Sequence, residues 1–371
     1  MAGEGDRRRR RTGRPAGPSA GAALGRLTGA ALVLAAVAAL PGPAAAETPG
    51  ANCAPAPAPV QALAYGSRYA DGSENRTRLD ADADAEVDAA LKPVDDFLRD
   101  LADRANGVHA PGADPPAIAA CVLARLAPWA RADALAELDT TAARLTAGSR
   151  LAAFALILRQ VVPHAGAGDG DKVGLVSDWL ARRVVAQMRF WEQDAPEGAR
   201  QGNLRAWAAL AAAATADLTD DAIMRGWAAW STAHVLCTAN PDGSLPQEMT
   251  RGRWALHYQL HAVAPLAVSA ALLEPRGFPV AGRCGAALAR VVRYTVSELD
   301  DGRLTQARTG EVQTFFDGTR QLEGFNLAWL EAYLTLDPDP ALEALASVWR
   351  PLSHSKLGGD QTAIWAAERD R

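Results

Sequence analysis

Apolar residues recur at helical spacing along almost the whole chain, and this pattern limits the fold more than any other feature. Alternating β-branched residues are nearly absent, so strands should be a minor element. Ala and Leu dominate the apolar positions, which favours close packing of helices. We predict helices at residues 83–105, 116–129, 131–147, 150–162, 173–194, 204–214, 220–238, 249–273, 281–298, 324–335 and 340–349.

About a dozen such helices joined by short loops indicate antiparallel hairpins arranged in a ring or a solenoid. No repeat of the tetratricopeptide or ankyrin kind is visible. No Ser/Gly-rich linker divides residues 47–371, which we therefore predict to be one all-α domain. A ring of hairpins would leave a cleft at one end.

The first 46 residues are typical of a secretory signal peptide rather than of a folded element. Arg7 to Arg11 and Arg14 are basic, residues 29–40 form a short apolar run, and Ala44 to Ala46 fit a cleavage site. The alternative is a membrane anchor, but the apolar run is shorter than the roughly 20 residues that a span needs. We therefore expect export, and no later segment that crosses a membrane.

Removal of this segment makes the protein more acidic. It carries seven Arg and two acidic residues, so its loss shifts the net charge from −5 to −10. An acidic surface argues against a nucleic-acid partner. A polyanion would have to be bound by locally clustered Arg.

The four cysteines all follow the predicted signal peptide. Export permits disulfides, and four cysteines allow three pairings. We favour Cys53 with Cys121 and Cys237 with Cys284; the alternative is four buried thiols. No CxxC motif or Cys/His cluster indicates zinc, and we expect no metal and no other cofactor.

A polar face is expected on the helix that starts near Gln247. Seven residues separate Arg251 from Tyr258, nearly two helical turns, so both should point the same way about 10 Å apart. A guanidinium can bind a carboxylate through two hydrogen bonds, and a phenol can carry a proton. The pair suits proton removal beside the carboxylate of a sugar acid. His257 and His261 have the spacing of a zinc pair, but no third ligand follows.

A second polar cluster, at residues 201–203, opens the predicted helix 204–214. Asn203 is either a site residue or an ordinary helix cap. The chain also has ten Trp, whose rings can stack on sugars, although most should fill the core. Trp207 and Trp254 are the exceptions, because they stand beside the polar residues.

Four stretches of sequence carry a resemblance to a known family. They are Gly66-Ser-Arg-Tyr-Ala-Asp-Gly-Ser73, Ala120-Cys-Val-Leu-Ala-Arg-Leu-Ala-Pro-Trp-Ala130, the long segment from Pro241 to Tyr258, and Leu357-Gly-Gly-Asp360. In this order and spacing the chain resembles the mannuronate-type alginate lyases, family five of the polysaccharide lyases. The likeness covers nearly the whole mature chain.

The resemblance implies an (α/α) toroid in the periplasm that cleaves 1,4-linked D-uronate polymers, above all mannuronate-rich alginate. The reaction would be a β-elimination that leaves a 4,5-unsaturated product. Asn203 and Arg251 would neutralise the substrate carboxylate, and Tyr258 would protonate the leaving oxygen. The expected substrate contacts are Arg68, Trp207, Arg253, Trp254 and His257. The expected partner is an acidic polysaccharide, bound by a monomer.

One position departs from the family pattern. The family motif reads Asn-Asn-His-Ser-Tyr-Trp, whereas this chain has Gly202-Asn-Leu-Arg-Ala-Trp207, so Leu204 stands where the family has its catalytic histidine. Tyr258 would then serve as both base and acid in a syn elimination on mannuronate. Guluronate needs two residues on opposite faces, so it should suffer most.

Neighbouring charges would support this use of Tyr258. Arg251, with Arg253 or Arg205 nearby, would favour its phenolate. His257 points about 100° away from Tyr258 on a helix and is expected to support the site rather than to replace the base. Two other interpretations stay open: a weakened or inactive polyuronate-binding relative, and a lyase for another polyuronate such as glucuronan.

Overall fold

The computed structural model describes residues 53–369, so the predicted signal peptide at 1–46 lies outside the described residues. The described part belongs to one compact unit that begins at Thr48. Its helices are α1 Ala81–Asn106, α2 Pro115–Arg131, α3 Thr141–Val161, α4 Gly170–Arg189, α5 Asn203–Thr219, α6 Ala222–Leu236, α7 Pro246–Met249, α8 Ala255–Leu273, α9 Arg283–Ser297, α10 Arg303–Thr309, α11 Gly324–Leu327, α12 Leu330–Leu336, α13 Pro340–Trp349 and α14 Gln361–Arg369.

The strands are short. β1 (Ala62–Leu63) pairs in parallel with β2 (Glu137–Leu138), and β3 (Ser353–His354) pairs antiparallel with β4 (Gly359–Asp360). Because each strand has only two residues, helices carry the fold, as the sequence predicted.

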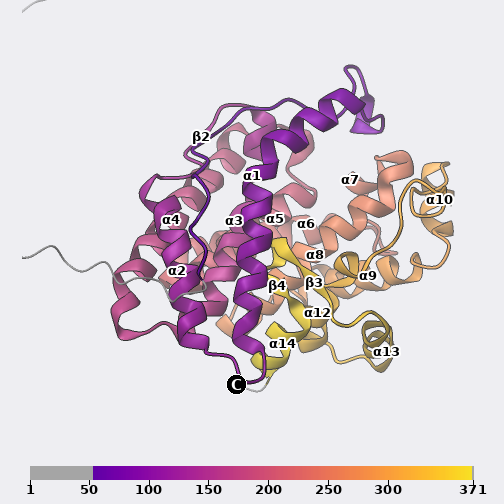
Figure 1. The fold of residues 1–371 in the computed structure, drawn as a ribbon. Helices are drawn as coiled ribbons and strands as arrows, with labels where there is room; N and C mark the ends of the chain where they lie inside the picture. Colours follow the sequence, from indigo (N-terminus) through magenta and orange to yellow (C-terminus); the bar gives the residue numbers. More distant parts are fainter. Residues whose placement is uncertain (1–52, 370–371) are drawn as a thin grey trace, which may run out of the picture. The chain divides into compact units, whose positions relative to one another are not determined.

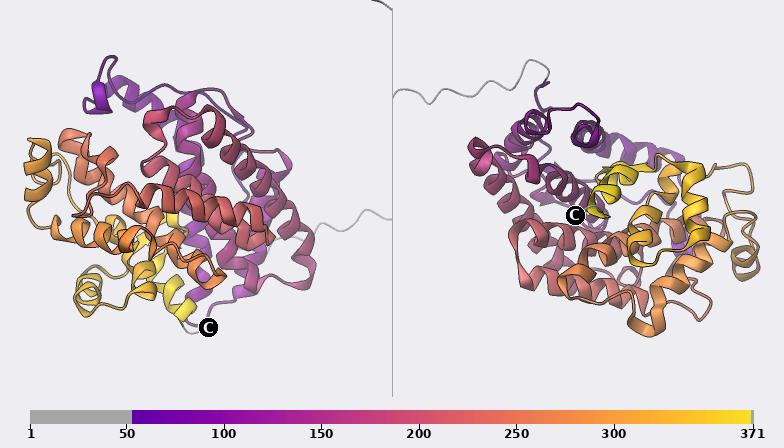
Figure 2. Two further views of the ribbon diagram at one scale, coloured as in Figure 1. Left: turned by 180° about the vertical axis from the view of Figure 1, so that it is seen from behind. Right: turned by 90° about the horizontal axis from the view of Figure 1, so that it is seen from below.

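The helices form an (α/α) toroid (Figures 1 and 2). On the inside, α1 packs on α3, α3 on α5, α5 on α8 and α8 on α12. On the outside, α2 contacts α4, and α6 contacts α9. Near the C-terminus, β4 and the adjoining 3-10 turn Ser355–Leu357 pack against α1, so the two ends of the ring meet. The sequence predicted either a ring or a solenoid of hairpins, and the structure is a ring.

Small residues bring α3 and α5 unusually close. A Cβ at Gly148 would stand 2.8 Å from the backbone nitrogen of Ala208, so only glycine fits at this crossing. The Ala residues along α5 are almost completely buried. Large side chains fill the space elsewhere, and the fully buried tryptophans are Trp129, Trp179, Trp191, Trp207 and Trp329. Half of the ten tryptophans are therefore fully buried, and Trp254 and Trp365 are also buried.

Two helical stretches beyond the predicted signal peptide are long and apolar enough to cross a membrane by length and composition. They are Thr141–His164 and Gly252–Arg276, and 83% of the apolar window of each is buried inside the protein. The expectation that no later segment crosses a membrane stays a prediction. Both stretches are apolar because α3 and α8 are central helices of the toroid, and a helix surrounded by other helices is apolar on all sides.

The predicted helix at residues 131–147 is wrong over residues 132–140. α2 ends at Arg131, and residues 132–140 form a turn and β2. Asp133 and Leu135 have positive φ angles, 51° and 57°, which a helix does not accept. The side chain of Thr140 then accepts a hydrogen bond from the backbone N–H of Ala143 and starts α3. Two short helices, α10 and α14, were not predicted.

Both favoured disulfides are present. Cys53 is joined to Cys121, which ties the segment before β1 to α2. Cys237 is joined to Cys284, which ties the end of α6 to the start of α9. The described part of the chain contains no free cysteine.

Candidate functional site

A cleft of about 780 Å³ opens at one end of the toroid. The N-terminal ends of α1, α3, α5 and α8 meet there, together with the segment before α1 and the loop after β3. Its polar and aromatic lining includes Tyr65, Arg68, Tyr69, Arg76, Asp84, Asp88, Arg150, Asn203, Arg251, Trp254, His257, Tyr258, His261, Arg320, His354 and Lys356. The cleft therefore combines most of the predicted site residues with cations that the motifs did not point to.

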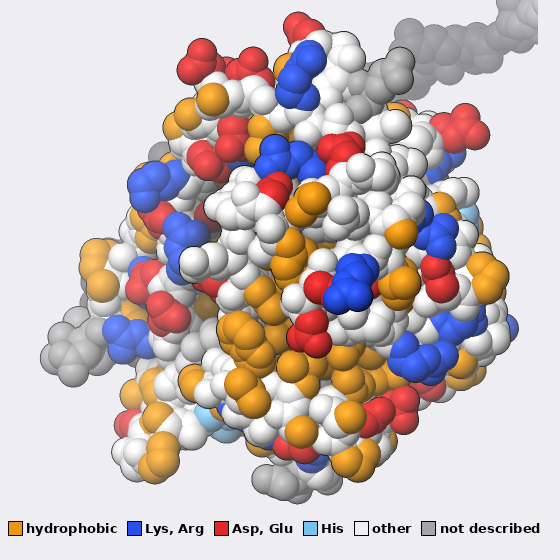
Figure 3. All heavy atoms as spheres, turned by 90° about the vertical axis from the view of Figure 1, so that its right-hand side faces the viewer, with side chains coloured by type: hydrophobic (Ala, Val, Ile, Leu, Met, Phe, Trp, Pro, Cys, Tyr) orange, Lys and Arg blue, Asp and Glu red, His pale blue; other side chains and the backbone are white. Residues whose placement is uncertain are grey.

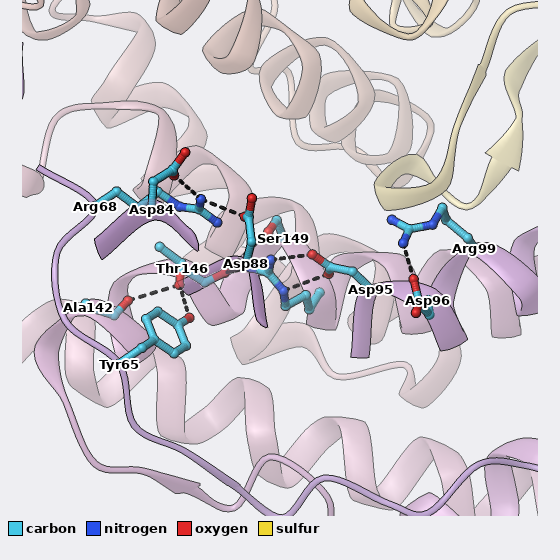
Figure 4. A network of polar contacts seen from close by, with 11 residues as sticks. Tyr65, Arg68, Asp84, Asp88, Asp95, Asp96, Arg99, Ala142, Thr146 and Ser149 are labelled. Carbon is cyan, nitrogen blue, oxygen red and sulfur yellow. Dashed lines mark hydrogen bonds and ion pairs between the residues drawn. The ribbon is translucent and has the colours of Figure 1, made fainter. Parts of the chain in front are cut away.

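Two of the arginines in the cleft are neutralised by carboxylates of α1. Arg68 forms ion pairs with Asp84 and, at 2.7 Å, with Asp88 (Figure 4). Arg150 forms two hydrogen bonds of 2.8 and 2.9 Å to Asp95, also on α1. These two arginines contribute little net charge to the cleft.

Four other cations line the cleft, and none of them forms an ion pair within residues 53–369. They are Arg76, Arg251, Arg320 and Lys356. Burial, with Arg150 next in effect, lowers the pKa of Lys356 to about 8. On the face of Figure 3, acidic and basic side chains are interspersed around apolar ones. The cleft therefore holds uncompensated positive charge in a protein whose net charge is −5.

Arg251 and Tyr258 meet in the cleft, but not along one helix. The expected continuous helix is broken, because α7 ends at Met249 and α8 begins at Ala255, with a 3-10 turn between them. The break lets the guanidinium fold over the ring, and the Arg251 Cζ atom lies 4.7 Å from the Tyr258 ring centroid. Arg251 Nη1 also donates a 3.3 Å hydrogen bond to the carbonyl oxygen of Asn75. The two side chains therefore meet as predicted, although the helix expected to carry both of them is interrupted.

The hydroxyl of Tyr258 contacts the hydroxyl of Tyr69, which comes from the segment before α1. Burial raises the pKa of Tyr69 above its ordinary value, and the charge of Arg251 opposes this shift in part. Tyr69 was not predicted as a site residue, although it belongs to the Gly66–Ser73 motif. The motif itself was the signal that could have found it.

Asn203 begins α5 and is 1% exposed. Its backbone N–H donates a 2.7 Å hydrogen bond to Glu248 Oε1, and its Nδ2 donates a 2.9 Å bond to Glu248 Oε2. Asn203 Oδ1 is buried and has no hydrogen-bond partner among residues 53–369. Burial raises the pKa of the fully buried Glu248, while Arg251 opposes the shift. Asn203 thus lines the cleft, and Glu248 on α7 fixes the position of its side-chain amide.

Leu204 lies beside Asn203 in the wall of the cleft. Its partly buried side chain packs on a small apolar cluster that contains Phe190 and Trp191. This position offers the cleft an aliphatic surface and no group that could accept a proton.

Three histidines line the cleft, and all have strongly lowered pKa values because they are buried. The pKa is about 4 for His257 and about 3 for His354, and that of His261 is well below its ordinary value. His261 Nδ1 accepts a 3.2 Å hydrogen bond from Trp207, and His354 Nδ1 accepts a 3.1 Å bond from the backbone N–H of Lys356. A neutral imidazole with an accepting Nδ1 carries its hydrogen on Nε2. His261 and His354 therefore offer the cleft donors, not bases.

Three of the five predicted substrate contacts line the cleft: Arg68, Trp254 and His257. Trp207 does not, because its 1% exposed ring is packed behind His261. Arg253 does not either; it turns away to pair with Asp317 and to donate a 2.6 Å bond to Thr319. These two predictions do not fit the geometry, since one side chain is in the core and the other is paired with residues that do not line the cleft.

Several cleft residues were missed by sequence reasoning. Lys356 stands directly before the motif at residues 357–360, which was a usable signal. Arg320, which stacks on Trp254 at 5.1 Å, lies in no motif, and neither does Arg76. Within residues 53–369 no three His, Cys, Asp or Glu side chains are placed to hold a metal ion.

Known proteins resemble this chain in sequence and in fold. The alginate lyase family model matches residues 160–304. An alginate lyase of Pseudomonas paraeruginosa is 26% identical over 85% of this chain and 86% of its own length. A polysaccharide lyase of Stenotrophomonas maltophilia is 27% identical, with coverage of 84% and 90%.

The fold points the same way. The crystal structure of alginate lyase A1-III from Sphingomonas species A1 superposes with a TM-score of 0.68 at 21% identity, covering 84% of this chain and 86% of that one. The sequence matches span most of both partners, and the structural match reproduces the helical toroid. The chain is therefore similar to the alginate lyases in sequence over most of its length and shares the helical toroid fold of alginate lyase A1-III.

Proposed function

We propose that this protein is a polysaccharide lyase that cleaves mannuronate-rich alginate by β-elimination in the periplasm. The observation that carries the proposal is the pairing of Arg251 with Tyr258 inside a cleft that holds four cations without carboxylate partners. A polyuronate carries one negative charge on each sugar. Such a polymer complements the cleft and is repelled by the acidic remainder of the protein.

Neutralisation of the substrate carboxylate is the first requirement of the reaction. The proton on C5 of a uronate becomes acidic only when the negative charge of the neighbouring carboxylate is offset. Arg251 supplies a fixed, buried guanidinium for this purpose, with Asn203 beside it in the cleft wall. Donors that are fixed at the site of developing charge contribute about 3–4 kcal/mol each to catalysis.

Proton transfer falls to Tyr258. The guanidinium over its ring favours the phenolate, which removes the C5 proton and then returns it to O4 as the C4–O4 bond breaks. One new C4–C5 double bond forms and one glycosidic bond is lost, so no external acid or base is consumed. This route needs both groups on one face of the sugar, as in the syn elimination expected for mannuronate.

The other candidate bases are poorly suited to the task. Leu204 has no ionisable group, and the accepting Nδ1 atoms of His261 and His354 are already occupied. A guluronate unit, which needs a base and an acid on opposite faces, should therefore be a poor substrate. Preference for mannuronate follows from the shortage of a second base.

The proposal is tested by incubating the mature protein with polymannuronate, polyguluronate and glucuronan. Absorbance of the new C4–C5 double bond reports turnover. We expect the fastest rise on polymannuronate and a much slower one on polyguluronate. A flat trace on all three polymers, with protein shown to be folded by circular dichroism, would reject the lyase activity.

Leu204 also favours a second function, a polyuronate-binding protein without turnover. This alternative predicts binding of polymannuronate without unsaturated product, and weaker binding after Arg251→Ala. Detection of unsaturated product by the unmodified protein rejects the alternative. Export is tested separately, by locating the mature protein in periplasmic and cytoplasmic fractions.

A further inference from the structure

The contact between Glu248 and Asn203 leaves one polar atom without a partner. Both carboxylate oxygens of Glu248 accept hydrogen bonds from Asn203, one from the backbone and one from the side-chain amide. Asn203 Oδ1, at the other corner of the amide, is buried and unpaired in the part of the chain that the structure describes. A buried oxygen in this state is unfavourable, because it has lost its hydrogen bonds to water without gaining others.

This arrangement suits a free protein better than a substrate complex. In it, the amide spends one of its two N–H donors on Glu248 and presents an acceptor oxygen on its other side. A uronate carboxylate needs donors. It would also meet a second, ionised carboxylate close behind the amide, and two like charges in one buried site repel each other.

Rotation of the amide by 180° removes both difficulties. The oxygen and nitrogen of an asparagine amide exchange places with almost no change in shape. A protonated Glu248 would donate its O–H to Asn203 Oδ1, while its carbonyl oxygen still accepts the backbone N–H of Asn203. Both N–H hydrogens of the Asn203 amide are then free to bind the substrate.

We propose that Glu248 carries a proton in the substrate complex and holds Asn203 by its side-chain oxygen, so that both amide hydrogens are available to the uronate carboxylate. Glu248 is a positioning residue in this scheme, because it acts through Asn203 and does not line the cleft. The inference rests on the proposed function, since it requires a uronate in the cleft.

The surroundings of Glu248 agree with a neutral acid. Its side chain is fully buried, and burial raises its pKa. Arg251 is the charged neighbour that opposes the shift, but it forms no ion pair with Glu248 and is engaged with Tyr258 and a backbone carbonyl. The substrate carboxylate would pair with the guanidinium of Arg251. Arg251 would then stabilise the ionised form of Glu248 less strongly.

The backbone around the pair is fixed tightly enough to keep this geometry. A Cβ at Gly202 would lie 2.7 Å from Glu248 Oε1, so glycine is needed for the close approach. The side chain of Gln247 accepts a 3.2 Å hydrogen bond from the backbone N–H of Gln201. α7 and the start of α5 are thus joined at two successive residues.

Substitutions of Glu248 distinguish whether its carboxyl group acts as a protonated hydrogen-bond donor or as an ionised acceptor. Gln cannot ionise; its oxygen must accept the backbone N–H of Asn203, so its NH₂ group faces the amide and requires Oδ1 there. We expect Glu248→Ala to lower kcat/KM on polymannuronate about 30-fold or more. Glu248→Gln should rescue most of this loss, to within about threefold of the unmodified protein.

A matched control is Glu331→Gln, which removes another fully buried carboxylate. Glu331 is ion-paired with Arg350, outside the cleft, so its loss should lower stability but leave turnover unchanged. In difference infrared spectra of oligomannuronate complexes, the band of a protonated carboxyl should be present in the unmodified protein and in Glu331→Gln, and absent in Glu248→Gln.

Two results would overturn the inference. One is a Glu248→Gln variant that is folded but as impaired as Glu248→Ala. The other is an infrared spectrum in which the unmodified complex has no protonated carboxyl band beyond that of Glu248→Gln. If the unmodified protein forms no unsaturated product, the proposed function fails instead, and affinity for oligomannuronate replaces turnover in the same comparison.

Discussion

The guanidinium of Arg251 lies over the ring of Tyr258, with 4.7 Å between its Cζ atom and the ring centroid. Arg251 lies in the break between α7 and α8, and Tyr258 lies in the first turn of α8. Arg251, which would bind the substrate carboxylate, and Tyr258, which would carry the proton, are therefore stacked on each other as one unit.

Replacement of Arg251 should remove the charge that this unit depends on. We expect Arg251→Ala to lower kcat/KM on polymannuronate about 100- to 1,000-fold. Arg253→Ala is the control, because that guanidinium pairs with Asp317 away from the cleft and its removal should change turnover less than about threefold. Equal losses in the two variants, measured by product absorbance, would contradict the assignment of Arg251.

Leu204→His should restore a second proton acceptor in the cleft wall. We expect turnover of polyguluronate to rise more than turnover of polymannuronate, because the anti elimination is the one that lacks a base. Leu204→Asn is the control for polarity without basicity. Ala206 is fully buried, so enlarging it as well would overpack the core. No gain on polyguluronate in a folded Leu204→His protein would count against this explanation of specificity.

The buried histidines make stability fall on acidification. His257 and His354 have folded-state pKa values of about 4 and about 3, against an ordinary value of 6.5. Below pH 6.5 the unfolded chain therefore binds protons that the folded protein does not, and folding loses up to about 1.4 kcal/mol per pH unit for each histidine. This stability is complete above pH 6.5 and is lost as the pH falls towards 4.

Urea unfolding at pH 7.0, 6.0 and 5.0 measures this effect. His354→Asn should flatten the dependence, because it removes one of the titrating groups. A free energy of unfolding that is constant across this range would show that the histidines are not held neutral.

The disulfides should be strong stabilisers. Cys53 and Cys121 are 68 residues apart in sequence, and Cys237 and Cys284 are 47 apart. Each disulfide should therefore contribute about 4 kcal/mol to the free energy of unfolding by restricting the unfolded chain. Replacement of either pair by Ser should lower the free energy of unfolding accordingly. Unchanged urea midpoints would show that the bond adds nothing in solution. A reductant should destabilise the unmodified protein but not a variant that lacks both pairs.

The fold could be predicted because its main signal is local. Helical periodicity and Ala-rich faces follow directly from the sequence, and so do most helix positions. The errors fall where one residue outweighs a pattern, as at Thr140, whose cap starts α3 inside a stretch predicted to be helical. The apolar character of α8 reads like a membrane span for a similar reason, since periodicity does not reveal what surrounds a helix.

The site was predictable where a motif carried it and not elsewhere. Arg251, Tyr258 and Asn203 were found because motifs contain them, and all three line the cleft. Arg320 and Lys356 reach the same cleft from distant parts of the chain, and only the closure of the ring brings them there. Trp207 shows the converse: it stands next to the site in sequence, yet its ring lies in the core.

The central claim is that Tyr258 carries out the elimination, and the rate of unsaturated-product formation by Tyr258→Phe tests it most directly. Phenylalanine keeps the ring under Arg251 and removes only the hydroxyl. On polymannuronate we predict no measurable turnover, with affinity for oligomannuronate within about threefold of the unmodified protein. Turnover at a rate close to that of the unmodified protein would contradict the account.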